Sequence, residues 1–165
     1  MIILGIDPGT RITGYGLIKV QDAGFSAIDY GCIKPDPAMK LTDRYLFISN
    51  GIDELLEKYR PDALVVETQY ISKNPHSTMK LIMVRGIIII AAKRKGIQVF
   101  EYAPTKAKLA VTGSGKASKF EVQRMVQLLL KLSKIPTPED AADALSIAIC
   151  HANSLKFNSL ISMEI

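Results

Sequence analysis

The fold is decided at the start of the chain, where residues 2–7 have the sequence IILGID and residues 13–20 have the sequence TGYGLIKV. The first run is apolar and rich in β-branched residues, which is typical of a strand covered on both faces. Pro8 and Gly9 end it. Strands are also predicted over residues 13–20 and 24–33, and the short turn between them joins antiparallel neighbours. The chain therefore begins with a three-stranded antiparallel meander.

Helices and short apolar strands alternate after the meander. Apolar residues recur every three or four positions from Leu41, which predicts a helix that ends before Pro61. The same reasoning predicts strands at 63–66 and 97–100, and helices at 77–93, after Pro104, at 119–132 and from Thr137, its N-cap. We expect an α/β fold, with a mixed five-stranded sheet made of the meander plus parallel strands and flanked by helices. Residues 153–165 lack a pattern and are predicted to form a flexible tail.

Composition narrows the class of protein. The chain has 165 residues, the length of one domain, and its apolar content of 48% excludes intrinsic disorder. A net charge of +5 is compatible with a polyanionic partner. Cys32 and Cys150 match no metal-ligand spacing, and the N-terminus lacks the basic region of a signal peptide. The apolar stretch at 81–92 is too short to span a membrane and predicts a buried helix. We expect a cytoplasmic protein.

Two predicted buried strands end in an acid. Asp7 ends the first strand and Glu67 follows the strand at 63–66. A carboxylate beside an apolar strand costs desolvation free energy unless it is paired, hydrogen-bonded or bound to a metal. Ligands gather at the carboxyl ends of strands in sheets of this type. The two acids are therefore candidates to share a cation, and helix capping or simple surface exposure is the alternative.

A second pair of acids stands on the last predicted helix. Asp140 and Asp143 are three residues apart and share a face. Asp140 could serve only the helix dipole, whereas the small residues around Asp143 permit another element to approach closely. Four gathered carboxylates suit Mg²⁺, or alternatively Mn²⁺, and could support two ions in phosphodiester cleavage. Lys108 and Lys119 are candidates to stabilise the developing charge, although each could equally be a solvated surface lysine.

Other functional motifs fail on inspection. Residues 113–118 have the sequence GSGKAS, which lacks the spacing and the Ser or Thr of a nucleotide phosphate loop. His76 and His151 have no partner at zinc-ligand spacing, and no G-x-S-x-G motif indicates a serine hydrolase. Residues 5–10, GIDPGT, resemble the first phosphate turn of the sugar-kinase, actin and chaperone-ATPase class. One lobe of this length does not form the two-lobed cleft of that class.

Four motifs in order carry a more specific likeness. They are MIILGIDPGTRITGYG at 1–16, VVE at 65–67 with Lys73-Asn74, VFEYAP at 99–104 and DAADALSIA at 140–148. Together they resemble the RuvC family of bacterial Holliday-junction resolvases over roughly residues 1–152. The resemblance implies a ribonuclease-H-like nuclease domain over that range. It also implies a homodimeric, magnesium-dependent endonuclease that nicks two opposed strands of a four-way DNA junction, and a partnership with the RuvA–RuvB branch-migration complex.

The resemblance assigns roles to particular residues. Asp7, Glu67, Asp140 and Asp143 match the acidic, metal-binding cluster of the family, and Lys108 and Lys119 match lysines beside the scissile phosphate. The DNA-binding candidates are Tyr70, Lys73, Lys108, Lys116 and Lys119. Tyr70 stands where the family usually has a phenylalanine. The resemblance implies that the phenylalanine ring stacks on bases at the junction centre, and a tyrosine ring keeps that capacity.

Two questions remain open at the level of sequence. The helix at 77–93 is apolar around much of its circumference, so it is either the dimer interface or a buried core helix. The activity also has two alternatives: a catalytically silent junction-binding protein of the same fold, and a general structure-selective nuclease. The full set of acids argues against the silent protein, and cleavage of plain duplex at an equal rate would indicate the general nuclease.

Overall fold

The computed structural model describes residues 1–21, 24–68, 74–156 and 163–164. Its sheet has the strand order β3-β2-β1-β4-β5-β6. These strands are β1 (Ile2–Asp7), β2 (Thr13–Gln21), β3 (Gly24–Ile33), β4 (Ala63–Glu67), β5 (Gln98–Tyr102) and β6 (Met163–Glu164). The first three strands are antiparallel neighbours, while β4 runs parallel to both β1 and β5. The predicted mixed sheet, a meander plus parallel strands, is confirmed.

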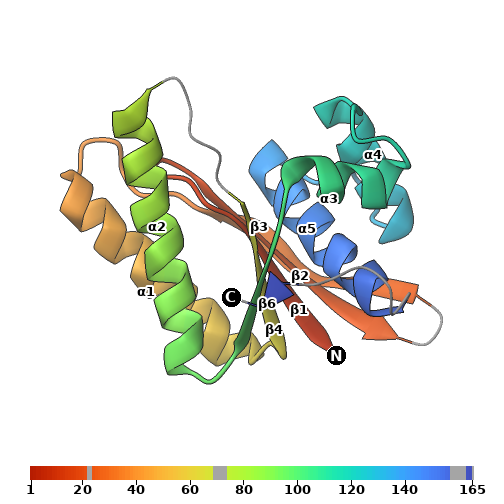
Figure 1. Ribbon diagram of the computed structural model, residues 1–165, viewed down its shortest axis with the longest axis horizontal. Coiled ribbons are helices and arrows are strands. Elements are labelled where there is room, and N and C mark those ends of the chain that lie inside the picture. Colours follow the sequence, from red (N-terminus) through yellow and green to blue (C-terminus); the bar gives the residue numbers. More distant parts are fainter. Residues whose placement is uncertain (22–23, 69–73, 157–162, 165) are drawn as a thin grey trace.

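Helices cover both faces of the sheet and make three layers (Figure 1). One face carries α1 (Leu41–Tyr59) and α2 (Pro75–Arg94). The other carries α3 (Pro104–Thr112), α4 (Lys119–Leu129) and α5 (Glu139–Lys156). Neighbouring strand residues point to opposite faces, so Ile3 packs in the α3–α5 core and Leu4 in the α1–α2 core. The covered faces explain why β1 and β4 are apolar throughout.

The C-terminal part differs from the prediction. Helix α5 continues to Lys156, past the expected domain end at residue 152, because Ala152 and Ser154 are still buried. Strand β6 adds a sixth, two-residue strand antiparallel to β5, which the sequence pattern did not indicate. Both features depend on contacts with distant residues, which local patterns do not encode. The domain boundary at 152 and the flexibility of the tail stay predictions.

Several element ends also shift by a few residues. Helix α2 begins at Pro75, two residues before the predicted start, because the Asn74 side chain accepts hydrogen bonds from the backbone N–H groups of His76 and Ser77. Strand β5 covers residues 98–102 instead of 97–100, α4 ends at 129 instead of 132, and α5 begins at 139. These shifts are one to three residues long, and they leave the type and order of the elements unchanged.

Helix α2 is buried on one side only. Its spacing groups Met79, Ile82, Met83 and Ile90 on one face, and these four side chains are each more than half exposed. The buried residues are Thr78, Val84, Ile88, Ala91 and Ala92. The expectation of a buried helix is therefore wrong for the outward face. By length and composition alone α2 could cross a membrane, but this is weak evidence for a helix that packs on α1 and β5.

The buried imidazole of His151 makes the fold sensitive to acid. His151 is fully buried, its ring centroid lies 4.3 Å from that of Phe100, and its Nδ1 lies 3.0 Å from the Tyr102 hydroxyl. Burial lowers the pKa of His151 to about 4. Because the folded protein holds the neutral form, this contribution to stability is complete above about pH 6.5 and is lost as the pH falls toward 4.

We expect the free energy of unfolding to drop by about 2–3 kcal/mol through this group, at about 1.4 kcal/mol per unit of pKa shift. Urea unfolding at pH 7 and pH 4.5 measures it in the wild type and in His151→Phe, which keeps an aromatic ring and removes the titration. The difference in stability between the two proteins should move in favour of the variant as the pH falls. A difference that does not change with pH would contradict the prediction.

Candidate active site

Two acids meet at the carboxyl ends of β1 and β4. The strands are parallel, with Ile6 paired to Val66, so Asp7 and Glu67 follow at adjacent positions. Both residues are half-buried, and their carboxyl groups hydrogen-bond to each other. Alternation points the residue before each acid into the α1–α2 core, which turns both acids toward α5. Strand register thus brings together two acids that are 60 positions apart in the chain.

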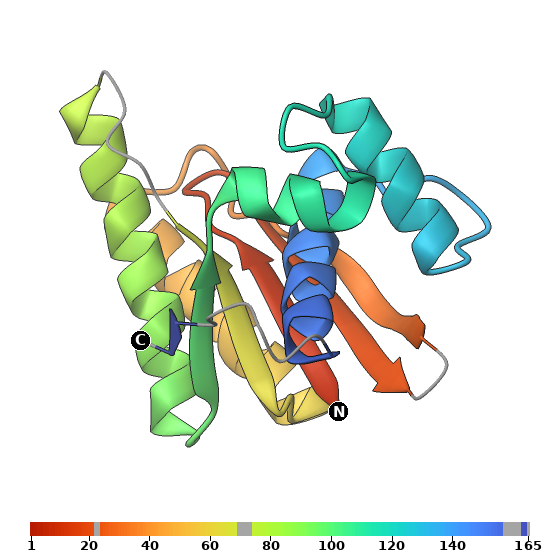
Figure 2. The same ribbon diagram turned by 45° about the vertical axis from the view of Figure 1, so that its right-hand side comes forward.

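Glycines let α5 rest directly on the sheet, as Figure 2 shows for its path over β1 and β2. A Cβ atom added to Gly5 would lie 2.0 Å from the backbone oxygen of Ala144. One added to Gly14 would lie 2.1 Å from the backbone oxygen of Asp140. Glycine inside a strand marks such a close backbone approach. Asp140 and Asp143, in the first turns of α5, are therefore held beside Asp7.

The four acids interact electrostatically. Burial, followed by the charges of Glu67 and Asp143, raises the pKa of the Asp7 carboxyl from 3.8 to about 9. Burial also raises the pKa of Glu67 and of Asp143, and the charge of Asp140 adds to the rise at Asp143. Without a cation, the cluster therefore retains a proton at neutral pH. A hydrogen bond between two carboxyl groups requires one proton, so Asp7 and Glu67 share one.

The donor set of the cluster fits a divalent cation. Within residues 1–21, 24–68, 74–156 and 163–164, no three acidic, histidine or cysteine side chains already surround one point at metal-binding distance. Burial and the negative charges of neighbouring acids nevertheless raise the pKa of Asp7 and of Asp143, because the fold holds these carboxylates close together. Carboxylate oxygens are the ligands that Mg²⁺ and Mn²⁺ prefer, and such an ion would replace the shared proton.

Two lysines face the same cluster. Their positive charges lower the pKa of Glu67 and of Asp143, against the effect of burial. Lys108 comes from α3, and its Nζ donates to the backbone oxygen of Ala117 at 3.0 Å. Lys119 opens α4, and its Nζ lies 2.9 Å from Oε2 of Glu139. Both ends of that ion pair are more than half exposed, so the pair is weak and leaves Lys119 available to another anion.

The remaining DNA-binding candidates are less well placed by the structure. Lys116 is exposed in the loop between α3 and α4, where its backbone N–H donates to Ser114 Oγ. Tyr70 and Lys73 lie outside the described residues. Their proposed roles therefore stay predictions.

The structure adds Cys32 to the surroundings of the acids. Gly14 pairs with Asp7 on one side and with Cys32 on the other, so Cys32 lies level with Asp7 two strands away, near the end of β3. Burial, together with the charges of Asp140 and Asp7, raises the pKa of Cys32 to about 11. The thiol therefore stays protonated and is no nucleophile. Pairing the three predicted strands of the meander residue by residue would have placed Cys32 near Gly14, and so near Asp7, from sequence alone.

Comparisons with known proteins agree with this geometry. The family model described as crossover junction endodeoxyribonuclease RuvC matches residues 3–151. A protein of that name from Protochlamydia amoebophila is 60% identical over 92% of this chain and 90% of its own length. Another, from Ruminiclostridium cellulolyticum, is 44% identical over 99% of both chains.

A solved structure is similar over the whole fold. It is the RuvC of T. thermophilus in complex with a Holliday junction substrate, with a TM-score of 0.91 and 31% identity over 99% of each chain. A second solved structure, described as the Thermus thermophilus RuvC structure, gives a TM-score of 0.88. The expected ribonuclease-H-like architecture is confirmed by this likeness.

Proposed function

This chain belongs to the RuvC family of crossover junction endodeoxyribonucleases, and from that premise we propose that it resolves four-way DNA junctions by paired nicks on opposed strands. The observation that carries the proposal is the cluster of Asp7, Glu67, Asp140 and Asp143 beneath two lysines. Bringing four half-buried acids together costs folding free energy, and such costly arrangements are concentrated at functional sites. Phosphodiester hydrolysis with metal ions is a reaction that uses a cluster of this kind.

The four acids would hold the metal, with Mg²⁺ as the ion and Mn²⁺ as a substitute. Two ions per site, held by these carboxylates, would supply positive charge at the scissile phosphate and an acidified water molecule. Asp7 would be ionised with a cation in the site, because its raised pKa comes from burial and from neighbouring negative charge, which a cation offsets. Asp7 stands at the end of β1 beside β4 and interacts with the acids of α5, so it would be one of the residues that hold the ion.

Lys108 and Lys119 bind the scissile phosphate. Both are close enough to Glu67 and Asp143 to lower the pKa of these acids, so their charges lie at the same place as the developing negative charge. Positioned cations stabilise a phosphorane-like transition state strongly, because they need no reorganisation during the reaction. Lys119 exchanges its exposed partner Glu139 for the phosphate.

A nicking assay on a synthetic four-way junction tests the function. With Mg²⁺ the protein should cut two opposed strands at symmetric positions, and with EDTA it should bind without cutting. Binding with no cutting in Mg²⁺ or Mn²⁺ would favour the catalytically silent junction-binding protein. Equal rates on plain duplex would favour a general structure-selective nuclease.

A homodimer suits a substrate with two symmetric cutting sites. The outward face of α2 supports it as the interface, because Met79, Ile82, Met83 and Ile90 are all more than half exposed. Among the described residues, no atom outside the local turns of α2 lies within 4 Å of the position where Gly86 would carry a Cβ. Contiguous apolar patches of this kind mark interaction sites in soluble proteins. The interface would join two copies through their α2 helices.

We expect Ile82→Asp to convert the dimer into monomers, because a charge in the centre of an apolar interface is costly to desolvate. Sedimentation equilibrium measures the mass. Leu128→Asp is the matched control, since Leu128 is 62% exposed on α4, across the sheet from α2. The monomeric variant should also leave single nicks where the wild type makes pairs. A dimer that survives Ile82→Asp would rule out this face.

The remaining assignments rest on the family resemblance. Tyr70, Lys73 and Lys116 contact the junction DNA, the RuvA–RuvB complex is the partner machine, and the protein acts in the bacterial cytoplasm. Co-purification with RuvA–RuvB on junction DNA tests the partnership directly.

A further inference from the structure

A basic hollow lies beside the acid cluster and is not part of it. Its volume is about 400 Å³, and it is formed where the β1–β2 loop meets the first turns of α1 and α2. Three cations line it, Arg11, Arg44 and Lys80, together with the hydroxyl groups of Thr10 and Ser77. Two leucines complete the lining, and no acid contributes to it.

The cations of the hollow are available to a ligand. Within the described part of the chain, Arg11 and Lys80 are exposed and form no ion pair. Arg44 is half-buried, and its Nε and Nη2 donate to the backbone oxygens of Met39 and Pro37 at 3.0 and 3.2 Å. Those bonds orient the guanidinium and leave further N–H donors unused. Three like charges held together without a counter-charge make a site for an anion.

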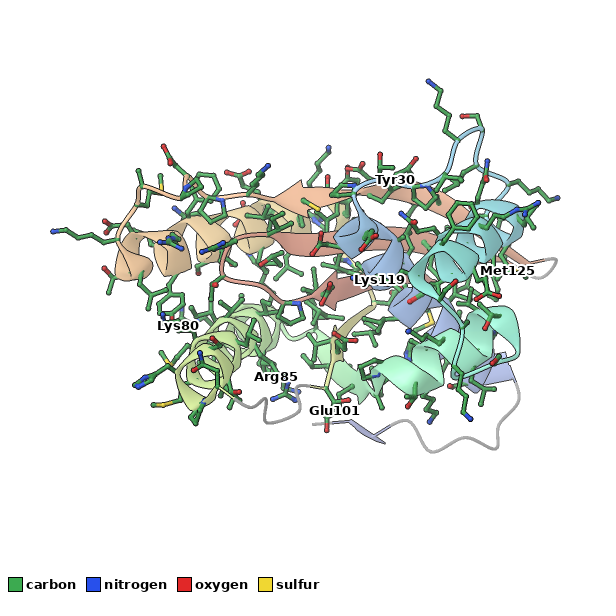
Figure 3. The ribbon with its side chains drawn as sticks, turned by 90° about the horizontal axis from the view of Figure 1, so that it is seen from above. Tyr30, Lys80, Arg85, Glu101, Lys119 and Met125 are labelled. Carbon is green, nitrogen blue, oxygen red and sulfur yellow. The ribbon has the colours of Figure 1, made fainter. Side chains whose placement is uncertain are left out.

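The location of the hollow in the fold indicates which anion it would bind. Arg11 follows Asp7 by four residues, so their backbones are at most about 14 Å apart. Ser77 and Lys80 stand on α2, whose next face outward carries Met79 and Met83. Figure 3 looks onto this end of the molecule and shows Lys80 on the α2 side and Lys119 on the other. The hollow is therefore bounded on one side by the loop that follows Asp7 and on the other by α2, the helix that also carries the face that we assign to the dimer axis.

We propose that this hollow binds a backbone phosphate of the junction close to the branch point, on the stretch of strand that runs from the cleavage site toward the two-fold axis. The assignment rests on the proposed function and on the α2 dimer. Arginine and lysine with hydroxyl donors are the usual contacts to DNA phosphates, which position the nucleic acid and carry no sequence information. The contact fixes where the branch point sits relative to Asp7.

The first test measures junction binding in EDTA, where no cleavage occurs. The variants are Arg11→Gln, Lys80→Gln and the double variant, and Arg94→Gln removes one charge from the exposed far end of α2 as the control. We expect the double variant to bind about 10-fold more weakly, with a salt dependence lower by about one released ion per lost phosphate contact. The control should match the wild type. Circular dichroism verifies the fold of each variant.

The second test neutralises single phosphates. Junctions carry one methylphosphonate linkage at successive positions around the branch point. One position should weaken binding by the wild type and leave binding by the double variant unaffected, because the lost contact is then already absent. No such position, or an equal loss of affinity by the double variant on plain duplex, would overturn the proposal. If the wild type itself does not nick junctions in Mg²⁺, the proposed function fails instead.

Discussion

Asp7→Asn is expected to abolish junction cleavage while junction binding persists. The substitution keeps the side-chain shape and removes the acid that hydrogen-bonds to Glu67 and interacts electrostatically with Asp140 and Asp143. Loss of a catalytic group of this kind lowers rates by about 10³-fold or more. Binding depends on cationic contacts to phosphates, which the variant retains. Single-turnover cleavage in Mg²⁺ and gel-shift affinity in EDTA measure the two effects separately.

The same variant is expected to be more stable than the wild type without metal. Folding raises the pKa of Asp7 above its unfolded value, so the charged form is disfavoured in the native state. Wild-type stability in EDTA should therefore fall as the pH rises from about 4 toward 9, and the variant should lack this fall. Its melting temperature at pH 8 should be several degrees higher, at about 2–4 °C per kcal/mol for a domain of this size.

Adding Mg²⁺ should stabilise the wild type much more than the variant, because the ion replaces the shared proton of the cluster. Glu54→Gln, which removes an exposed acid from α1, is the control and should leave cleavage unchanged. Cleavage by Asp7→Asn at the wild-type rate would exclude Asp7 as a metal ligand. Loss of binding together with cleavage would contradict the separation of the two roles.

Gly14→Ala should damage both the fold and the reaction. Its Cβ would lie 2.1 Å from the backbone oxygen and 2.9 Å from the Cβ of Asp140, so the start of α5 must move. Overpacking of this kind costs about 1–3 kcal/mol, and more where backbone has to shift. A displacement of about 1 Å in a catalytic group lowers rates by about 10²-fold. Thermal unfolding and cleavage below the melting transition measure the two losses.

Gly115→Ala is the matched control for stability. A Cβ on Gly115 would lie 3.4 Å from the nearest atom, the backbone oxygen of Thr105, which is an ordinary contact. Its melting temperature should equal that of the wild type. If Gly14→Ala also melts and cleaves like the wild type, α5 is free to shift on the sheet, and close packing is not what positions Asp140.

The sequence predicted most of the fold because its signals are local. The apolar β-branched run of β1, the period of α1 and the proline and glycine punctuation each act within a few residues. It was less informative about Gly51, which a propensity scale treats as a weak point of α1. An added Cβ there would lie 2.9 Å from Ile33, so the glycine exists for packing between α1 and β3. Helix propensity describes residues in an isolated helix, so it does not include contacts with a residue on another element.

The chemistry of the candidate site was also visible in the sequence, because acids at the ends of apolar strands are costly and therefore meaningful. The strand ends that carry Asp7 and Glu67 do lie side by side, and α5 brings Asp140 and Asp143 to them. The sequence did not indicate that Cys32 lies level with Asp7 or that Glu139 pairs with Lys119. Those relations come from register and helix placement.

The types of elements, their order and the carboxylates of the candidate cluster could all be predicted from sequence, because residue chemistry and periodicity are properties of short segments. Three features could be seen only in the folded chain: the apolar face of α2 points outward, α5 rests on glycines of β1 and β2, and Arg11, Arg44 and Lys80 line one hollow. The physical reason is that distances between residues far apart in the chain are set by packing, and packing balances contributions from every layer at once.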